Sequence, residues 1–590
     1  MKRSQWVTVS VVVLVTSIVT SASARAQTSD ERIRELMKQA AALTTPVAQV
    51  PVVRVPGEGP TLALTLDDAV KLALERNLDI VVQRLNPQLQ DIAMASAQAF
   101  YNPTLTSSVN RSSAVGVPNS QLQLSSGGRG ITQDQLGYNG GVQQNWRWGG
   151  GTLAATLNNG RFESDSNNAL FNPQFNSNWS AVLTQPLLRG FRIDAQRRQL
   201  QITRVNRDVS EVQVRAAVTN TVSNVRNAYW DYVYTTQAVE VARQSLDLAS
   251  KLVQDNQTRV EIGTMAPIDV VQAQAEQATR RQALVNAEND RRTAELALKR
   301  LIVSGTEDPT WASTLDPTER PDFHPEPVDL EGAIRRALGE RTDMAIAKKQ
   351  IENNSTTLRY LRDQTLPDVE AQATYGLQGI GGAQQIRSNS GVLGSQITQV
   401  IPGGVFDSFR SLFVGNYPRW TVGLNISYPL GTSTQEAAVA RARVQLNQVE
   451  AQIKLIELQV ATEVTNAAIQ LRNAGEAVEA AQVAQDLSQR RLEAEQSKFE
   501  VGMSTNYFVV QAQRDMNESR NSELRAVLNY RKALVEFERL QQTTLQSSNI
   551  TVLQAGGGDG TATQGGGGGA NVAQQNGGGG GGGGGNSIGR

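Results

Sequence analysis

The chain of 590 residues contains no cysteine and a single histidine, His324. The absence of cysteine excludes a disulfide framework, a thiolate metal site and a lipid-modified N-terminal cysteine. One histidine argues against a zinc hydrolase and against a Ser-His-Asp triad. Lys plus Arg and Asp plus Glu each total 56, so the net charge is about zero and no nucleic-acid partner is expected. We therefore predict that the chain is not an enzyme and has no catalytic residue, metal ligand or cofactor.

Apolar runs of membrane-helix length are also missing. The longest, Val7 to Val19, follows Lys2 and Arg3 and precedes the small-x-small site Ala24 to Ala26. This order is typical of a secretory signal peptide cleaved after Ala26, whereas an uncleaved anchor would not need such a site. No later stretch approaches the ~20 apolar residues of a membrane helix. If the mature chain enters a membrane, we expect it to do so as a closed β-barrel.

The two ends of the mature chain differ in composition from the rest. Residues 27–60 contain a short helical pattern from Asp30 to Ala42 and then four prolines, which indicates a leader or linker. From Ala555 onward the chain is mostly glycine with Gln and Asn. Such a composition cannot bury enough apolar surface to fold, so a disordered tail is expected.

Between these ends the same unit occurs twice, which is the first feature to seek in a long chain. The helical pattern that begins at Leu66 resembles the one that begins at Leu330, 264 positions later. Asn102-Pro103-Thr104-Leu105 and Leu366-Pro367-Asp368-Val369 differ by the same 264 positions. Gln185-Pro186-Leu187 matches Tyr428-Pro429-Leu430 at 243 positions, so the first copy carries about twenty extra residues between its strands. Val260-Glu261-Ile262-Gly263-Thr264 matches Phe499-Glu500-Val501-Gly502-Met503 at 239 positions.

Two segments alternate with the period of a β-strand. The apolar members are Val369, Ala371, Ala373, Tyr375 and Leu377 in one, and Trp420, Val422, Leu424, Ile426 and Tyr428 in the other. An apolar face opposite a polar one is the pattern of a membrane-barrel strand, with aromatics near the interfaces. A half-buried strand of a soluble sheet gives the same alternation, so strands alone do not decide. In the first copy, Gly140 to Leu153 predicts either an extra hairpin, at about residues 138–160, or a decorated loop.

The remaining long segments have helical patterns. Ser433 with Glu436 makes a capping box, and no proline occurs from there to Phe499. Apolar residues recur at the coiled-coil spacing of three and four: Ile453, Ile456, Val460, Val464, Ala467 and Leu471. At 1.5 Å per residue this helix would be about 100 Å long. The helices Ile268–Val303 and Leu330–Leu366 would each span roughly 50 Å, so two of them end to end match one long helix.

These residues resemble the TolC family of outer-membrane efflux proteins over about residues 62–540. The most specific marks are the helix ending in Asn102 to Leu105, the turn Gln185-Pro186-Leu187-Leu188-Arg189-Gly190, and the two turns at Gly263 and Gly502. The resemblance implies a mixed α+β membrane protein. In that family a trimeric transmembrane β-barrel, with four strands from each protomer and twelve in all, continues as a long periplasmic α-helical coiled-coil barrel with two internal repeats per chain.

The resemblance also implies partners and a site. A periplasmic adaptor (membrane fusion protein) of an inner-membrane pump would dock at Gly263, Thr264, Gly502 and Met503, while outer-membrane lipid would surround the barrel of the homotrimer. A glycine there also suits the left-handed C′ position of a helix end, so a plain helix stop is an equally good interpretation. The family's constriction of the tunnel would correspond to Asp269, Phe499 and Phe508. Phe508 and Gln511 stand where the second repeat of the family has aspartates, so the acidic ring matches only in part.

The domain organisation expected from these patterns has six parts. They are a signal peptide (1–26), a leader (27–60), repeat 1 (61–303, strands at about 103–187, turn near 263), a Pro-rich linker (304–328), repeat 2 (329–545, strands at about 367–430, turn near 502) and a Gly-rich tail (546–590). The expected function is passive conduction across the outer membrane of a Gram-negative bacterium, as the channel of a tripartite efflux or type I secretion system. The alternative is a structural periplasmic coiled-coil spacer or adaptor without a pore. The sequence does not identify the cargo.

Overall fold

The computed structural model describes residues 59–117, 130–166, 169–320, 323–325, 327–387, 396–431 and 433–547. The expected signal peptide, the helical pattern from Asp30 to Ala42 and the glycine-rich tail lie outside these residues. The described residues all belong to one of the chain's two units, Met1–Thr551. Within them, no helix combines the length and the apolar composition needed to cross a membrane.

Two helices of 67 residues dominate the described chain. They are α5 (Ala195–Glu261) and α11 (Thr434–Glu500). At 1.5 Å per residue each is about 100 Å long. The capping box predicted for α11 is confirmed: the Ser433 side chain accepts from the Glu436 N–H, and the Glu436 carboxylate accepts from the Ser433 N–H. Because the cap satisfies otherwise unpaired N–H groups, it fixes where the helix begins.

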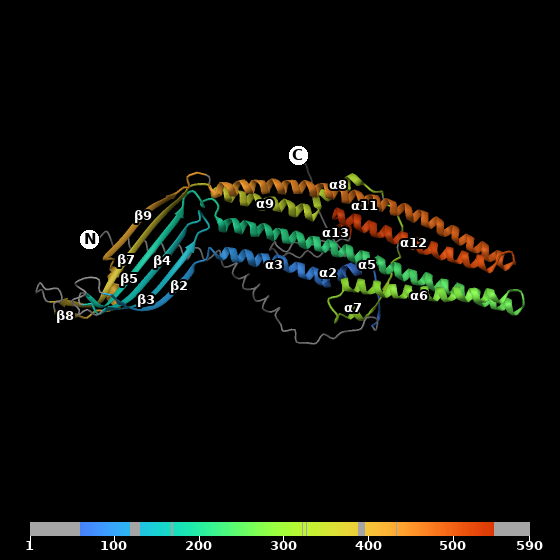
Figure 1. Cartoon of the computed structure of the whole chain (residues 1–590), viewed down its shortest axis with the longest axis horizontal. Coiled ribbons are helices and arrows are strands. Elements are labelled where there is room, and N and C mark those ends of the chain that lie inside the picture. Colours follow the sequence, from blue (N-terminus) through green and yellow to red (C-terminus); the bar gives the residue numbers. More distant parts are fainter. Residues whose placement is uncertain are drawn as a thin grey trace, which may run out of the picture. The chain divides into compact units, whose positions relative to one another are not determined.

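Shorter helices accompany the two long ones. They are α2 (Leu66–Arg76), α3 (Leu78–Ala99), α6 (Pro267–Ile302), α7 (Pro309–Ala312), α8 (Leu330–Glu340), α9 (Thr342–Asp363), α12 (Asn506–Gln541) and α13 (Thr544–Ser547). Figure 1 shows α6 and α3 following α5, and α12 and α9 following α11, in agreement with the contacts between these helices. In each repeat, the long helix and the helix after its turn thus form a helical hairpin, α5–α6 or α11–α12. The two shorter helices of the repeat, α2 and α3 or α8 and α9, pack along the rest of the long helix.

The prediction of one continuous helix from Leu330 to Leu366 is wrong. The chain leaves the helical conformation at Arg341 (φ −61°, ψ 136°), and it does the same at Asn77 in the first repeat. Asn77 caps α3, because its Oδ1 accepts from the N–H groups of Asp79 and Ile80, while its Nδ2 donates to the carbonyl of Leu301 at 2.9 Å. In the first repeat a tertiary contact of Asn77, rather than proline or glycine, therefore interrupts the helix.

The start of repeat 1 and the Pro-rich linker form a small sheet that the sequence did not reveal. β1 (Thr61–Leu64) pairs in parallel with β6 (Thr314–Pro317). The hydroxyl of Tyr229 donates to the carbonyl of Leu64 at 3.2 Å, and that of Tyr232 donates to Leu315. Burial raises the pKa of both phenols to about 12, so both remain hydrogen-bond donors at any physiological pH. The pairing, between residues 253 positions apart such as Thr61 and Thr314, is held against the middle of α5.

The second sheet is antiparallel and has seven strands. They are β2 (Thr104–Gly116), β3 (Ile131–Asn145), β4 (Thr152–Ser164), β5 (Phe171–Pro186), β7 (Asp368–Arg387), β8 (Ile397–Ile401) and β9 (Tyr417–Ser427). Six of them follow the order β2-β3-β4-β5-β7-β9, and short β8 pairs with the end of β7 beyond β9. The sequence left open whether the first repeat contains an extra hairpin or a decorated loop. Residues 131–164 form a hairpin, β3–β4, and the Trp146 N–H closes its turn by donating to the Gly151 carbonyl at 2.8 Å.

One helix occupies a segment where the sequence indicated only a loop. α10 (Val405–Val414) packs on the ends of β5 and β7. Gly379 and Gly381 allow this contact, since a Cβ at Gly379 would lie 2.0 Å from the carbonyl oxygen of Ser408. The hydroxyls of Ser408 and Ser177 are hydrogen-bonded at 2.9 Å. Two glycines on one face of a strand are thus explained by close approach of a helix.

Candidate functional site

Toward the helices, the six long strands present one apolar and one polar face, whereas toward the other end Arg111 and Arg161 lie in one row with Leu136 on that same first face. Side chains alternate along each strand, so residues paired across the sheet share a face. One cross-strand row consists of Leu105, Val142, Ala155, Ala181, Tyr375 and Trp420. The adjacent row, on the opposite face, consists of Thr106, Gly141, Thr156, Ser180, Gly376 and Arg419. The hydroxyls of Thr156 and Ser180 are hydrogen-bonded at 2.9 Å on this polar face. The alternation predicted for two strands therefore extends over six.

Both long helices end in the same turn. Gly263 and Gly502 follow α5 and α11, and each has φ of 78° in the left-handed region that glycine favours. The bonds that close the turns are Thr264 N–H to Arg259 O (2.9 Å) and Met503 N–H to Lys498 O (2.8 Å). This is the Schellman pattern, in which the residue after the left-handed one bonds back to the helix. We call residues 262–266 and 501–505 together the tip.

The tip turns expose several apolar side chains. Gly263, Thr264, Gly502 and Met503, the predicted docking residues, are all exposed. Ile262 is 67% exposed and Val501 70%, and Met503 is 79% exposed. The turns are closed by backbone hydrogen bonds, so their stability does not depend on these exposed apolar side chains. This surface is therefore available to an apolar partner.

The three residues predicted to form the constriction lie in different surroundings. Phe499 is buried among Leu252, Val253, Ala273 and Val509. The Arg259 guanidinium lies over its ring, 4.3 Å from the centroid. Phe508 is exposed and its ring packs edge-on against Tyr507. Asp269 is partly buried in the first turn of α6. The structure thus separates Phe499, which packs the two repeats together, from the exposed Phe508.

Sequence reasoning missed the polar contacts that join the two repeats above the tip. Asn256 of α5 is fully buried and donates to Oδ1 of Asn506 at 3.0 Å. The Nδ2 of Asn506 in turn donates to the carbonyl of Asp269 at 3.4 Å. One side chain of α12 therefore connects α5 and α6. No local sequence signal identifies this contact, because Asn and Gln are frequent throughout both helices.

Glu276 makes the strongest link between α6 and α12. Its side chain is only 3% exposed, and its Oε1 accepts from Arg280 Nε at 2.7 Å. Its Oε2 accepts from Arg514 Nε at 3.1 Å. Burial alone would raise the pKa of Glu276, but the hydrogen bonds from Arg514 and Arg280 hold that pKa below its ordinary value of 4.5. The carboxylate is therefore ionised and paired at neutral pH.

This ion pair predicts an acid-sensitive contact between α6 and α12. A carboxylate with a lowered pKa stabilises the folded contact fully above its ordinary pKa of 4.5, and this stabilisation is lost as the pH falls through the lowered value. Glu276→Gln should weaken the α6–α12 contact by about 2 kcal/mol at pH 7. The substitution should also abolish the loss of protection from amide hydrogen exchange that the wild type shows at this contact below pH 4.5. Amide hydrogen exchange of 270–280 and 510–518 at pH 7 and pH 4 measures both effects, and an unchanged acid response in the variant would contradict the assignment.

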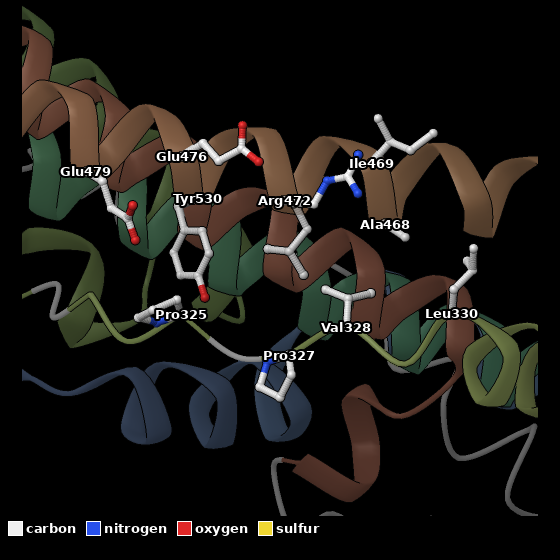
Figure 2. Close-up of a pocket in the computed structure, with 12 residues that line it drawn as sticks. Pro325, Pro327, Val328, Leu330, Ala468, Ile469, Arg472, Glu476, Glu479 and Tyr530 are labelled. Carbon is white, nitrogen blue, oxygen red and sulfur yellow. The ribbon is translucent and has the colours of Figure 1, made fainter.

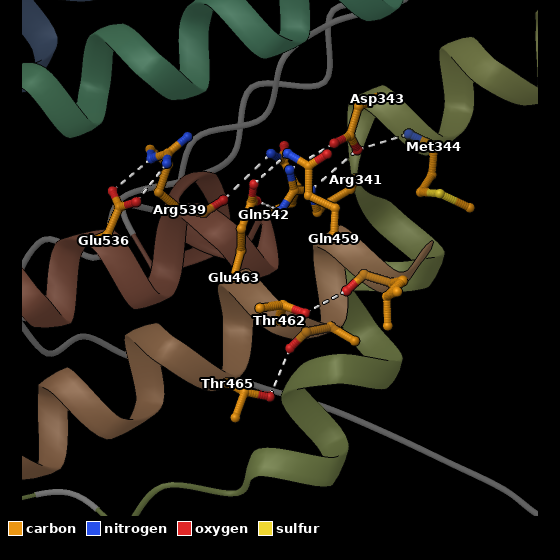
Figure 3. Close-up of polar contacts among 12 residues, drawn as sticks. Arg341, Asp343, Met344, Gln459, Thr462, Glu463, Thr465, Glu536, Arg539 and Gln542 are labelled. Atoms are coloured by element: carbon orange, nitrogen blue, oxygen red, sulfur yellow. Dashed lines mark hydrogen bonds and ion pairs between the residues drawn. The ribbon is translucent and has the colours of Figure 1, made fainter. Parts of the chain in front are cut away.

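A second charged network lies at the break between α8 and α9, as Figure 3 shows. Arg341 pairs with Glu463 of α11 at 2.6 Å and with Asp343 at 2.7 Å. Burial alone would raise the pKa of Glu463, but hydrogen bonds from Gln459 and Arg341 lower it. The residue that interrupts the helix is thus the one that ties it to α11.

A groove of about 370 Å³ lies where the linker crosses α11 and α12 (Figure 2). Pro325, Pro327 and Val328 form one side, and Arg472 and Tyr530 belong to the other. The Tyr530 hydroxyl donates to the His324 carbonyl at 2.9 Å, so the groove is where the linker packs on the helices. It offers no arrangement of groups for chemistry.

The architecture of the chain is that of outer-membrane channels. Channel CmeC of Campylobacter jejuni has 13% identity and a TM-score of 0.57, covering 82% of this chain and 90% of that one. VceC of Vibrio cholerae has 14% identity and a TM-score of 0.56, covering 81% and 95%. The open state of MtrE of Neisseria gonorrhoeae has 16% identity and a TM-score of 0.53, covering 84% and 93%.

The family follows from the sequence itself. The model of the outer membrane efflux protein family matches residues 151–303 and 333–541, which is more than half of the chain. The chain belongs to this family, and its place is the outer membrane, with its helices in the periplasm. No curated protein matches the chain. The predicted resemblance and location are confirmed, and members of the family are channels for transport rather than enzymes.

Proposed function

We propose that three copies of this chain form a passive conduit from the periplasm through the outer membrane. The observation that carries the proposal is the division of the sheet into two faces. The apolar face suits lipid, and the polar face, which contains Thr106, Thr156 and Ser180, suits water. A sheet with this division can satisfy its edges in a bilayer only by closing, because unpaired backbone groups are costly in lipid.

The edges of the sheet support closure by identical copies. β2 and β9 are exposed along their whole length and lie at opposite ends of the six-strand order. Such long exposed edges recruit further strands unless they are protected. A symmetric assembly in which β2 of one copy meets β9 of the next leaves no edge. Three copies are the number that the family resemblance implies.

The tip is the proposed contact with a periplasmic adaptor of an inner-membrane pump. Its two Schellman turns present the same backbone conformation at Gly263 and Gly502, with apolar side chains beside them. Energy for export would come from that pump. The alternative, a periplasmic coiled-coil spacer without a pore, accounts for the helices but leaves the apolar face of the sheet uncovered except where α10 packs on it.

Migration in detergent separates these two functions. The membrane-embedded trimer should resist SDS at room temperature and migrate as an oligomer, and heating should convert it to the monomer. It should also fractionate with the outer membrane. A spacer protein would be released from membranes by salt or alkali and would migrate as a monomer without heating. That result would exclude the conduit.

A further inference from the structure

The insertion in the first repeat changes the geometry of the pore. We propose that hairpin β3–β4 is part of the membrane wall, so that three copies close an eighteen-stranded barrel whose lumen accepts cargo too wide for a twelve-stranded one. The inference rests on the proposed function, and it concerns the width of the channel rather than its existence. Twelve strands are what the family resemblance implies, with four from each copy.

The first support is the backbone pairing of the hairpin. β3 pairs with β2 from Thr104 to Gly116, and β4 pairs with β5 from Thr152 to Phe162. β3 and β4 have 15 and 13 residues, and the flanking strands β2 and β5 have 13 and 16. A loop folded into the lumen or over the outside would not pair along its full length on both sides. The hairpin lies within the sheet, as Figure 1 also shows.

The second support is the side-chain pattern. Val142, Leu153 and Leu157 of the hairpin share a face with Leu105 and Trp179 of the flanking strands. The opposite face of the hairpin carries polar or small residues at Gln143, Gly141, Asn139, Thr156 and Asn158. A membrane strand needs this alternation on both faces, whereas a lumen-filling plug would need none. Over the part of the sheet nearest the helices, the hairpin therefore meets the same requirement as its neighbours, and beyond it Arg161 of β4 shares a row with Arg111 of β2.

The insertion of the hairpin leaves the direction of the edge strands unchanged. Two inserted strands keep the total even, so β2 and β9 run in opposite directions with or without the hairpin. A copy of β9, with 11 residues, can then continue the antiparallel order beside a copy of β2, with 13. The partner that fits each open edge is therefore a second copy of this chain. An odd insertion would have forced a parallel pair at every junction.

The consequence for width follows from barrel geometry. The diameter of a barrel grows roughly linearly with its number of strands, so eighteen strands give a lumen about 1.5 times as wide as twelve. Barrels of 16–18 strands generally enclose an aqueous channel. The glycines at Gly137, Gly140 and Gly141 add little volume to either face of β3. We expect the cargo of this channel to be correspondingly bulky.

Cysteine pairs test the position of the hairpin directly, because the chain has no cysteine of its own. Ser108, Asn139, Asn158 and Asn178 form one cross-strand row on the polar face. With the hairpin in the wall, Ser108 and Asn178 are three strand spacings apart, about 14 Å, which is too far for a disulfide. We expect S108C/N139C to cross-link in cells under oxidation and S108C/N178C not to. A strong S108C/N178C cross-link within one chain would overturn the proposal.

Deletion of residues 131–166 supplies a matched variant. β2 and β5 are antiparallel and their faces agree, so removing the hairpin should bring Ser108 beside Asn178 and create the cross-link that the full chain lacks. This second arm and the comparison of widths that follows both depend on the deletion variant folding. The first arm uses the full chain and stands by itself.

Width is measured with graded maleimide-polyethylene glycols added outside intact cells. Ser180→Cys lies on the polar face in both the full chain and the deletion variant, and Ala181→Cys lies on the apolar face. We expect the full chain to react at residue 180 with reagents about 1.5 times wider than the deletion variant accepts. An equal cut-off in both would overturn the wider lumen. Equal reactivity at residues 180 and 181 would instead refute the proposed function, since no water-filled lumen would then exist.

Discussion

Replacing both Gly263 and Gly502 with tryptophan should abolish export while leaving trimers in the outer membrane. Each glycine has φ of 78°, which costs an L-residue about 1–2 kcal/mol. Neither glycine has an atom within 4 Å of the position that a Cβ would take, so the added ring would project into the surrounding space. That space is where the adaptor is proposed to bind. Export is measured as the loss of resistance to a pumped compound, and trimers by migration in SDS.

The alanine double variant separates the two roles of these glycines. G263A/G502A carries the same backbone strain with almost no added bulk. If docking is the role, it should retain most of its export, while the tryptophan variant retains none. Equal loss in both variants would identify the glycines as helix stops only. Normal export by the tryptophan variant would refute docking at these turns.

Reversing the buried charge at Glu276 should loosen the tip and increase conductance. Glu276→Lys would place three cations together, since Arg280 and Arg514 both contact this carboxylate. Breaking a buried ion pair costs about 3–5 kcal/mol, and the lower figure applies because Arg514 is half exposed. We propose that the resting conduit is closed where the helices converge at the tip, so that about 3 kcal/mol corresponds to roughly a hundredfold shift between closed and open forms. Cells should then become permeable to large antibiotics that normally do not enter.

Asp290→Lys provides the control for this variant. Asp290 is exposed on the same helix, so the same charge change there should leave permeability near the wild-type level. The effect of Glu276→Lys should also diminish in high salt, which screens repulsion among the three cations. If cells with either variant are equally permeable to the antibiotics, the net charge of α6 rather than the α6–α12 contact controls the tip.

Local rules predicted a large part of this fold. The capping box at Ser433 placed the start of α11, because helix ends have local requirements that single residues meet. Strand alternation identified the two faces of the sheet, since every second residue of a strand points to the same face. Helix length followed from the absence of proline. These features depend on short segments and can therefore be predicted from them.

The features that the sequence did not reveal depend on distant partners. β1 and β6 lie about 250 residues apart, and nothing in either segment marks the other. The interruption at Arg341 is stabilised by Glu463 of another helix, and α10 is placed by two glycines of β7. At the candidate site, the turns at Gly263 and Gly502 were predictable from the repeat. The contacts of Glu276 and Asn506 were not, because both residue types are common in these helices.

Single-channel recording tests the central claim most directly. The purified wild-type protein and Glu276→Lys would be reconstituted separately in a planar bilayer. The conduit predicts discrete openings, rare for the wild type and long-lived for the variant, with a conductance that follows the salt concentration. A silent wild type with a conducting variant would still fit a closed tip. Silence from both, when both are folded SDS-resistant trimers, would contradict a water-filled path through this protein.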